Sequence, residues 1–319
     1  MQTARVPVSQ FVSLLIPCYN AERWVAQAIH SALDQTYKHK EVIVVDDGST
    51  DGSLEIIKSF GDQIRWETGP NRGGNVARNR LLELSNGEWL QYLDADDYLL
   101  PTKVENQLQE ASTEHVDVIY SPPLVEVWKS SGQCEASSGS NYDLRDPLPL
   151  QWIRWQVAQT GTLLWRTEAL RNIGGWNEEF PCCQDNELTL RAIIRGLRFL
   201  LVNRNEAVYR LWSQETVCRK NPRLVIEVKT RLIDEMIEWV RHQPVDHSRM
   251  QEEAGQACFE MARTLARMSI SSAAAYRKER RSKGLFLPRG PAAPVLFRLV
   301  QKCVGFSNAE RFARWRRHA

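Results

Sequence analysis

Residues 91–98 read Gln-Tyr-Leu-Asp-Ala-Asp-Asp-Tyr and place three carboxylates, Asp94, Asp96 and Asp97, directly after the apolar run 89–93. Such a run is typical of a buried strand that emerges from a sheet at its polar end. Carboxylates this close repel one another unless a cation lies among them. The pattern therefore predicts a divalent cation with oxygen ligands. An Asp-rich turn, whose side chains cap the following backbone, is the alternative.

Strands and helices are expected to alternate through the first hundred residues. The predicted strands are residues 11–16, 41–45, 63–67 and 89–93. The predicted helices between them are residues 22–33, 53–60 and 76–84. This alternation predicts an α/β fold with a parallel sheet that helices cover on both faces. Ligands of such sheets bind at the carboxyl ends of the strands, where the loops 17–20, 46–52 and 94–97 fall.

The pattern changes after residue 101. A polar, Ser/Gly-rich stretch at 130–146 predicts a mobile surface loop. From residue 224 onward the apolar spacing favours helices, mainly at 225–240 and 251–270. We therefore expect two domains, a sheet-containing one at residues 1–220 and a helical extension at residues 221–319.

Composition and charge restrict the class of protein. The chain has 319 residues, of which 43% are hydrophobic and 25% charged, as in soluble globular proteins. Residues 277–319 carry twelve Lys and Arg against two acids, and we call this segment the basic tail. Seven cysteines without C-x-x-C spacing, and no apolar secretory core in residues 1–12, lead us to expect a cytoplasmic protein. Apolar runs stay shorter than the roughly 20 residues of a membrane-spanning helix.

Five short motifs follow one another in a characteristic order. They are V-S-L-L-I-P-C-Y-N at 12–20, V-V-D-D-G-S-T-D at 44–51, N-R-G-G-N-V-A-R-N at 71–79, L-D-A-D-D at 93–97 and Q-D-N-E-L at 184–188. In this order and spacing, the sequence resembles family 2 glycosyltransferases from residue 12 to residue 210. The resemblance implies a GT-A fold, with a Rossmann-like, mostly parallel sheet and a C-terminal helical extension added to it. It also implies sugar transfer from a nucleotide-diphospho-sugar, with uridine favoured, in polysaccharide or glycolipid biosynthesis.

The resemblance also assigns a nucleotide site. Its expected residues are Pro17, Tyr19, Asn20, Asp47, Arg78 and Asp94. An aromatic ring such as that of Tyr19 can stack on a nucleobase. By resemblance, Asp47 accepts the base N–H of uracil, although thymine and guanine present a donor as well. A helix cap by one carboxylate of the pair Asp46 and Asp47 is the alternative.

The metal site is assigned in the same way. By resemblance, Asp96 ligates Mn²⁺ or Mg²⁺ that bridges the diphosphate, and Asp94 contacts the ribose or the sugar. The metal would act as a Lewis acid that stabilises the departing diphosphate. Asp97 is expected either to support these carboxylates or to cap a helix before Pro101.

Asp185 matches the position of the family's general base, which takes a proton from the acceptor hydroxyl. A helix N-cap is the alternative role for Asp185, and Glu187 is the second candidate for the base. With one base and no evident nucleophile for the opposite face of the sugar, we expect a single inverting displacement.

The sequence departs from the family after Tyr209 and Arg210. Many relatives have a His shortly after this pair, whereas this chain has Trp212. The indole could offer a platform for a sugar ring, and the exchange puts the affinity for metal in doubt.

Two other functions would make different demands on the sequence. A sugar nucleotidyltransferase would need a Gly-rich, basic phosphate loop after the first strand, and residues 18–20 lack one. A catalytically inactive nucleotide-sugar-binding module would not need Asp94, Asp96 and Asp185 together. The expected partners are therefore a nucleotide-diphospho-sugar donor and a saccharide, lipid-linked or other hydroxyl acceptor, without nucleic acid.

The basic tail carries the last expectation. Pro288, Pro291 and Pro294 prevent one continuous helix, so residues 294–304 and 308–317 are predicted to form two short ones. Basic residues interleaved with bulky apolar ones suit peripheral contact with an anionic bilayer at the inner face of the membrane. Packing of the apolar residues on the core, or on a second subunit, is the alternative.

Overall fold

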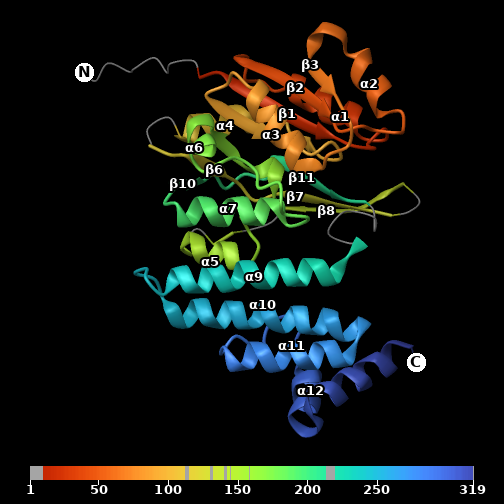
Figure 1. The fold of residues 1–319 in the computed structure, drawn as a ribbon, viewed down its shortest axis with the longest axis vertical. Coiled ribbons are helices and arrows are strands. Elements are labelled where there is room, and N and C mark those ends of the chain that lie inside the picture. The colour runs from red at the N-terminus through yellow and green to blue at the C-terminus, as the bar shows by residue number, and fades with distance from the viewer. Residues whose placement is uncertain are drawn as a thin grey trace. The chain divides into compact units, whose positions relative to one another are not determined.

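The computed structural model describes residues 10–111, 115–129, 132–139, 142–143, 145–157, 159–212 and 220–318. The chain forms two compact units, Met1–Arg145 with Gln156–Gln214, and Asp146–Trp155 with Glu215–Ala319 (Figure 1). The short segment 146–155 therefore belongs with the helices of the C-terminal part. The domain bounds that we expected, 1–220 and 221–319, stay a prediction.

A seven-stranded sheet lies at the centre of the first unit, in the order β10-β6-β9-β4-β1-β2-β3. Its strands are β1 Val12–Cys18, β2 Lys40–Asp46, β3 Arg65–Thr68, β4 Trp89–Tyr92, β6 Val118–Tyr120, β9 Leu164–Arg166 and β10 Phe199–Leu201. β1 pairs in parallel with β2 and β4, β2 with β3, and β6 with β10. Only β9 runs antiparallel, between β4 and β6. The mostly parallel sheet expected from the sequence is confirmed.

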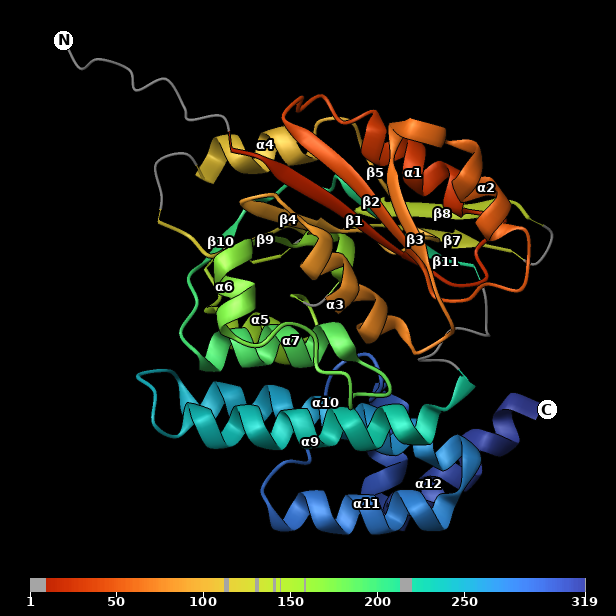
Figure 2. The same ribbon diagram turned by 45° about the horizontal axis from the view of Figure 1, so that its top comes forward.

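Helices cover both faces of this sheet, with α1, α2 and α4 on one face and α3, α6 and α7 on the other (Figure 2). They are α1 Val25–Leu33, α2 Ser53–Ser59, α3 Gly74–Leu84, α4 Lys103–Glu110, α6 Thr167–Asn172 and α7 Gln184–Ile194. Val12, Leu14 and Ile16 of β1 are fully buried in one apolar cluster with residues of α1 and α4. Because β1 is covered on both sides, its sequence is apolar almost throughout.

A second, four-stranded sheet in the first unit has the order β5-β11-β7-β8. Its strands are β5 Tyr98–Leu99, β7 Leu124–Trp128, β8 Cys134–Gly139 and β11 Ala207–Leu211. The expectation of a mobile loop over 130–146 is wrong for residues 134–139, because β8 pairs antiparallel with β7. Main-chain hydrogen bonds to a neighbouring strand need no apolar side chain, so the polar composition of β8 concealed it.

The second unit is helical. Its helices are α5 Leu148–Ile153, α9 Pro222–Val240, α10 His247–Met268, α11 Ile270–Ser282 and α12 Val295–His318. α12 is broken at Gly305, whose φ of 78° and ψ of 167° are not helical, so the tail forms two helical segments as expected. Among the described residues, no helix combines the length and the apolarity that crossing a bilayer requires.

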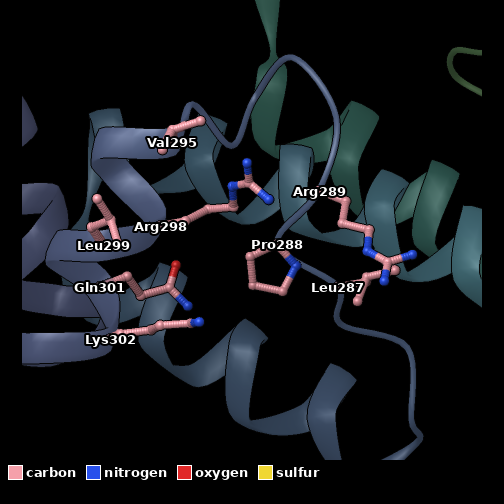
Figure 3. A pocket seen from close by; sticks show the side chains of 8 residues that line it. All are labelled: Leu287, Pro288, Arg289, Val295, Arg298, Leu299, Gln301 and Lys302. Carbon is pink, nitrogen blue, oxygen red and sulfur yellow. The ribbon is translucent and has the colours of Figure 1, made fainter.

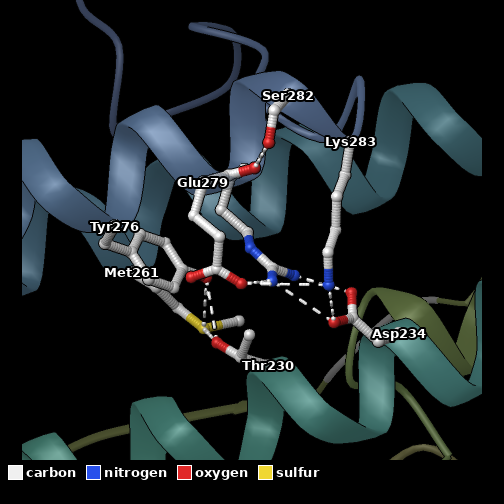
Figure 4. A network of polar contacts seen from close by, with 8 residues as sticks. Thr230, Asp234, Met261, Tyr276, Glu279, Ser282 and Lys283 are labelled. Carbon is white, nitrogen blue, oxygen red and sulfur yellow. Dashed lines mark hydrogen bonds and ion pairs between the residues drawn. The ribbon is translucent and has the colours of Figure 1, made fainter.

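A buried arginine joins the helices of this unit (Figure 4). The side chain of Arg280 on α11 is 1% exposed and donates to Asp234 Oδ1 on α9 over 2.6 Å. Lys283 Nζ donates to Asp234 Oδ2 over 2.7 Å. Burial opposes ionisation of Asp234, but the hydrogen bonds from Arg280 and Lys283 prevail and lower the pKa of its carboxyl. This network ties α11 to α9 by charge as well as by packing.

Candidate active site

The first two strands end side by side. Cys18 at the end of β1 is in register with Asp46 at the end of β2, so residues 19 and 20 lie next to residue 47. Asn20 accepts from Thr50 N over 2.8 Å, and its own N–H donates to Ser49 Oγ over 2.9 Å. Tyr19 is 51% exposed. The edge thus presents an open aromatic ring on a loop that hydrogen bonds hold in place.

Asp47 closes the neighbouring loop. Its Oδ1 accepts from Arg72 N over 2.8 Å and its Oδ2 accepts from Gly73 N over 2.9 Å, and the residue is only 7% exposed. The capping alternative that we considered for this pair is wrong, because the N-cap of α2 is Gly52 without a side-chain hydrogen bond, and Asp46 instead accepts from Ser49 N within the loop. Nothing in the local sequence indicated that Asp47 holds the glycine loop. Each carboxylate oxygen has a second lone pair for a base N–H.

Arg78 connects the end of β4 to the start of α7. Its Nη2 donates to Asp94 Oδ1 over 2.7 Å and its Nη1 donates to Gln184 Oε1 over 2.9 Å. The guanidinium lies 4.7 Å from the ring centroid of Trp176, and the side chain is 12% exposed. Because Asp185 follows Gln184, this bridge brings two distant motifs into one site.

Asp185 lies in the first turn of α7, after Cys183, which has a positive φ of 53°. Its Oδ1 accepts from Asn186 N over 2.9 Å, and the residue is half-buried. Glu187 differs, because it is 7% exposed and both of its carboxylate oxygens accept from Arg191, over 2.8 and 2.9 Å. A carboxylate held in such a bidentate pair is a poor proton acceptor. The geometry favours Asp185 over Glu187 as the base.

Trp212 makes a contact that the sequence did not suggest. Its indole Nε1 donates to Asp96 Oδ2 over 2.9 Å. Burial, together with the charge of Asp94, raises the pKa of the Asp96 carboxyl, and the indole hydrogen bond opposes this rise. Trp212 is therefore hydrogen-bonded directly to the carboxylate that we predicted as a metal ligand.

Asp97 is a buried carboxylate next to Asp96 in the sequence. It is 1% exposed, and it accepts from Arg210 N over 2.8 Å and from Gln159 Nε2 over 3.0 Å. Arg210 in turn donates from Nη1 to the backbone oxygen of Asp96 over 2.8 Å. Burial, with the charges of Asp96 and Asp94, raises the pKa of Asp97 well above its usual value. Of our two expectations for Asp97, the supporting role agrees with these contacts.

An aromatic cluster holds Arg210, and sequence reasoning missed it. The guanidinium lies 4.4 Å from the ring centroids of both Trp24 and Tyr98. Trp24 lies 5.9 Å from Trp212 and 5.0 Å from Trp128, measured between ring centroids. Trp24 falls within the helix predicted at residues 22–33, and local spacing does not reveal its proximity to an arginine far along the chain. The aromatic rings thus hold Arg210 in the position from which it contacts Asp96 and Asp97.

The carboxylates suit a metal that shares its ligands with a phosphate group. Among the residues that the structure describes, no three His, Cys, Asp or Glu side chains gather in a way that could hold a metal ion. A cation of the Mg²⁺ type is commonly bound through one or two carboxylates, completed by substrate phosphates and water. Asp94 and Asp96 provide that number, two residues apart directly after β4. The residues present therefore fit such a cation.

Known proteins are similar to this chain in sequence and in fold. The model of the family "Glycosyl transferase family 2" matches residues 13–142. The Escherichia coli UDP-Glc:alpha-D-GlcNAc-diphosphoundecaprenol beta-1,3-glucosyltransferase WfaP is 37% identical over 119 residues, which cover 37% of this chain and 47% of that protein. The match thus spans less than half the length of this curated relative.

Solved structures resemble the chain over more of its length. S. aureus TarS 1-349 in complex with UDP-GlcNAc has a TM-score of 0.66 at 16% identity, over 96% of this chain and 92% of that one. The mannosyltransferase PcManGT from Pyrobaculum calidifontis, in complex with GDP-Man and Mn²⁺, has a TM-score of 0.53 at 15% identity, over 98% of this chain and 85% of that one. At these identities the likeness concerns the fold, and the expected GT-A fold with C-terminal helices is confirmed. Residues 13–142 are thus similar in sequence to glycosyl transferase family 2, and the solved structures show a shared fold.

Proposed function

We propose that this protein is an inverting glycosyltransferase, a hexosyltransferase that moves a sugar from a nucleotide-diphospho-sugar to an acceptor hydroxyl. The observation that carries the proposal is the bridge of Arg78 between Asp94 and Gln184. It joins the carboxylates after β4, which suit a metal and a diphosphate, to the turn of α7 that bears Asp185. A metal-dependent donor site and a proton acceptor thereby belong to one constellation.

We propose a uridine-linked donor. The name of WfaP gives UDP-Glc as its donor, and TarS was solved with UDP-GlcNAc, whereas PcManGT was solved with GDP-Man. In this chain the exposed ring of Tyr19 would stack on the base, and Asp47 would accept its N–H. Pro17 and Asn20 shape the loop that carries Tyr19.

We propose that Asp96, with Asp94 beside it, holds Mn²⁺ or Mg²⁺ against the donor diphosphate. PcManGT, which was solved with Mn²⁺, supports a divalent ion in this fold. When bound, such an ion supplies Lewis-acid stabilisation of the leaving diphosphate. Arg78 keeps one oxygen of Asp94 in place, and Trp212 does the same for Oδ2 of Asp96.

The reaction that we propose is one displacement. The acceptor oxygen forms a bond to C1 of the sugar while the bond from C1 to the diphosphate oxygen breaks. Asp185 takes the proton that the acceptor hydroxyl loses. Attack from the side opposite the leaving diphosphate inverts the configuration at C1.

For the acceptor, we propose a saccharide or a lipid-linked saccharide in polysaccharide or glycolipid biosynthesis. The name of WfaP, which gives a diphosphoundecaprenol-linked sugar as its acceptor, supports this class. The cytoplasmic location at the inner face of the membrane also stays a proposal, and it fits a lipid-linked acceptor.

A screen of nucleotide-sugars tests the proposal without knowledge of the acceptor. The melting temperature of the full chain is measured with each nucleotide-sugar, with and without Mn²⁺. A ligand at a hundred times its Kd stabilises the native state by about 2.7 kcal/mol. We expect uridine-linked sugars with Mn²⁺ to raise the melting temperature and to release UDP slowly by hydrolysis. If no nucleotide-sugar shifts it under any condition, the protein is not a transferase of this kind.

A further inference from the structure

The second unit contains a basic, apolar-lined pocket that the proposed transferase reaction does not use. It has a volume of about 360 Å³ and lies between the start of α12 and the loop that precedes it. Arg298 and Lys302 point from α12 toward the loop that carries Pro288 and Arg289 (Figure 3). Its lining residues are Leu287, Pro288, Arg289, Val295, Arg298, Leu299, Gln301 and Lys302.

The pocket has one sign of charge. Among the lining residues, all of which the structure describes, none is acidic and three are cationic, namely Arg289, Arg298 and Lys302. Arg289 already has one anionic partner, Glu252. Oε2 of Glu252 accepts from Arg289 Nη1 over 3.2 Å, and both side chains are more than half exposed. An ion pair this open to water contributes little, so Arg289 can turn to another anion. The pocket is therefore complementary to a phosphate.

An exposed apolar surface adjoins these cations. Val295, Leu296 and Leu299 on the first segment of α12 are 63%, 51% and 56% exposed. Helical spacing puts Val295, Leu299 and Lys302 on one side of α12, with Arg298 at its edge. The opposite side of α12 packs against α10, because Phe297 is 7% exposed and its ring centroid lies 6.0 Å from that of Phe259. The open face is thus part of a fixed helix.

Large aliphatic side chains beside cations are costly in water and favourable at the surface of an anionic bilayer. There the cations contact lipid phosphates while the apolar side chains enter the boundary of the acyl chains. A free phosphate would use the cations only and would leave Val295, Leu296 and Leu299 uncovered. The second segment of α12 also exposes large apolar side chains, since Phe312 and Trp315 are 41% and 65% exposed. Trp is a residue that favours the membrane interface.

We propose that this pocket and the open face of α12 bind anionic phospholipid at a bilayer surface. Arg289, Arg298 and Lys302 hold the phosphate groups, and Val295, Leu296 and Leu299 insert into the boundary region. The inference gives the peripheral contact expected for the basic tail a defined site. It does not depend on the transferase assignment, because none of these residues belongs to the candidate active site.

Cosedimentation of the full chain with vesicles tests the proposal. Vesicles of phosphatidylcholine with phosphatidylglycerol are compared with vesicles of phosphatidylcholine alone. The triple variant Arg289→Gln, Arg298→Gln, Lys302→Gln removes the pocket's charge. Its matched control, Arg223→Gln, Arg267→Gln, Lys278→Gln, removes three exposed cations from other helices of the same unit. A further variant, Val295→Gln with Leu299→Gln, keeps the charge and removes the apolar contact.

We expect the wild type to bind only the anionic vesicles. At roughly fivefold per cation, the pocket triple variant should bind them on the order of a hundred times more weakly, and the apolar variant at least several-fold more weakly. The control triple variant should lose much less than the pocket variant. Circular dichroism and nucleotide-induced stabilisation should be unchanged in all variants, which separates this proposal from the transferase assignment.

Three outcomes would overturn the proposal. Equal losses in the pocket and control triple variants would mean that only net charge attracts the vesicles. Full binding by the apolar variant would mean a site for phosphate without lipid. Concentration-dependent association of the wild type, abolished in the apolar variant, together with no binding to vesicles, would mean that a second copy of the chain covers this face.

Discussion

Replacement of Arg78 by Met tests whether the bridge between Asp94 and α7 holds the candidate site together. Met preserves the aliphatic length and helix propensity of the position but removes the guanidinium. The hydrogen bond of Arg78 to ionised Asp94 is 2.7 Å long, and a bond of this kind contributes about 1.5–3 kcal/mol. The contact with Trp176 adds about 0.5–1 kcal/mol.

These terms overlap, and the Asp94 side chain is 28% exposed, so water recovers part of the loss. We therefore expect Arg78→Met to reduce the free energy of unfolding by about 1–3 kcal/mol, which corresponds to a fall in melting temperature of roughly 2–10 °C. Without Arg78, Asp94 lacks its cation beside Asp96. Excess Mn²⁺ should consequently raise the melting temperature of the variant more than that of the wild type.

Thermal unfolding with and without Mn²⁺ measures both quantities, and Arg78→Lys serves as the control. Lys keeps the charge without the planar fork, so it should give an intermediate loss and a response to Mn²⁺ close to that of the wild type. A loss below about 0.5 kcal/mol in Arg78→Met, the size of an ordinary surface change, would show that the bridge is unimportant. An unchanged response to Mn²⁺ would show that Asp94 does not lie in a cation site.

Three further predictions concern single substitutions. Asp96→Ala should abolish the Mn²⁺-dependent stabilisation by UDP in a folded protein, and Asp94→Ala should weaken it; a full shift in Asp96→Ala would refute the metal assignment. Trp212→Phe should weaken the apparent affinity for Mn²⁺ by roughly tenfold, the lower end of the effect expected for a residue that hydrogen-bonds to a metal ligand. Trp212→His should recover part of this affinity. Equal affinities of the wild type and Trp212→Phe in a Mn²⁺ titration would show that the indole does not support the metal ligand. Arg280→Met should cost about 3 kcal/mol in urea unfolding at neutral pH, because it removes the buried partner of Asp234. Since the pKa of Asp234 is lowered in the native state, this difference should persist above the unfolded value of about 4 and shrink as the pH falls further; a loss that is independent of pH would mean that packing rather than charge is at work.

The sequence was sufficient for the strand ends of the first unit. Apolar runs that stop at Cys18, Asp46 and Leu93 put the motif residues at one edge of a parallel sheet, and the structure has them there. Local patterns succeed here because a strand buried on both faces must be continuously apolar. The same logic found α9 and α10 in the second unit.

Contacts between distant segments could not be read in this way. Arg78 and Gln184 are 106 residues apart, and Asp96 and Trp212 are 116 residues apart. Neither pair leaves a local signature, so Arg78 was expected only beside the nucleotide and Trp212 only as a platform for a sugar. β8 escaped notice because its side chains are small and polar, and the direction of β9 depends on its neighbours rather than on its own residues.

The base assignment is the part of the proposed reaction that is most open to a direct test. Asp185→Asn keeps the shape of the side chain and its capping oxygen but removes the proton acceptor, whereas Glu187 remains paired with Arg191. With the sugar donor identified by the nucleotide-sugar screen, transfer to an acceptor hydroxyl is measured beside donor affinity in the same preparations. Our account predicts donor affinity within a few-fold of wild type and transfer reduced by about 100-fold or more. Transfer at the wild-type rate in Asp185→Asn, with the donor still bound, would contradict it.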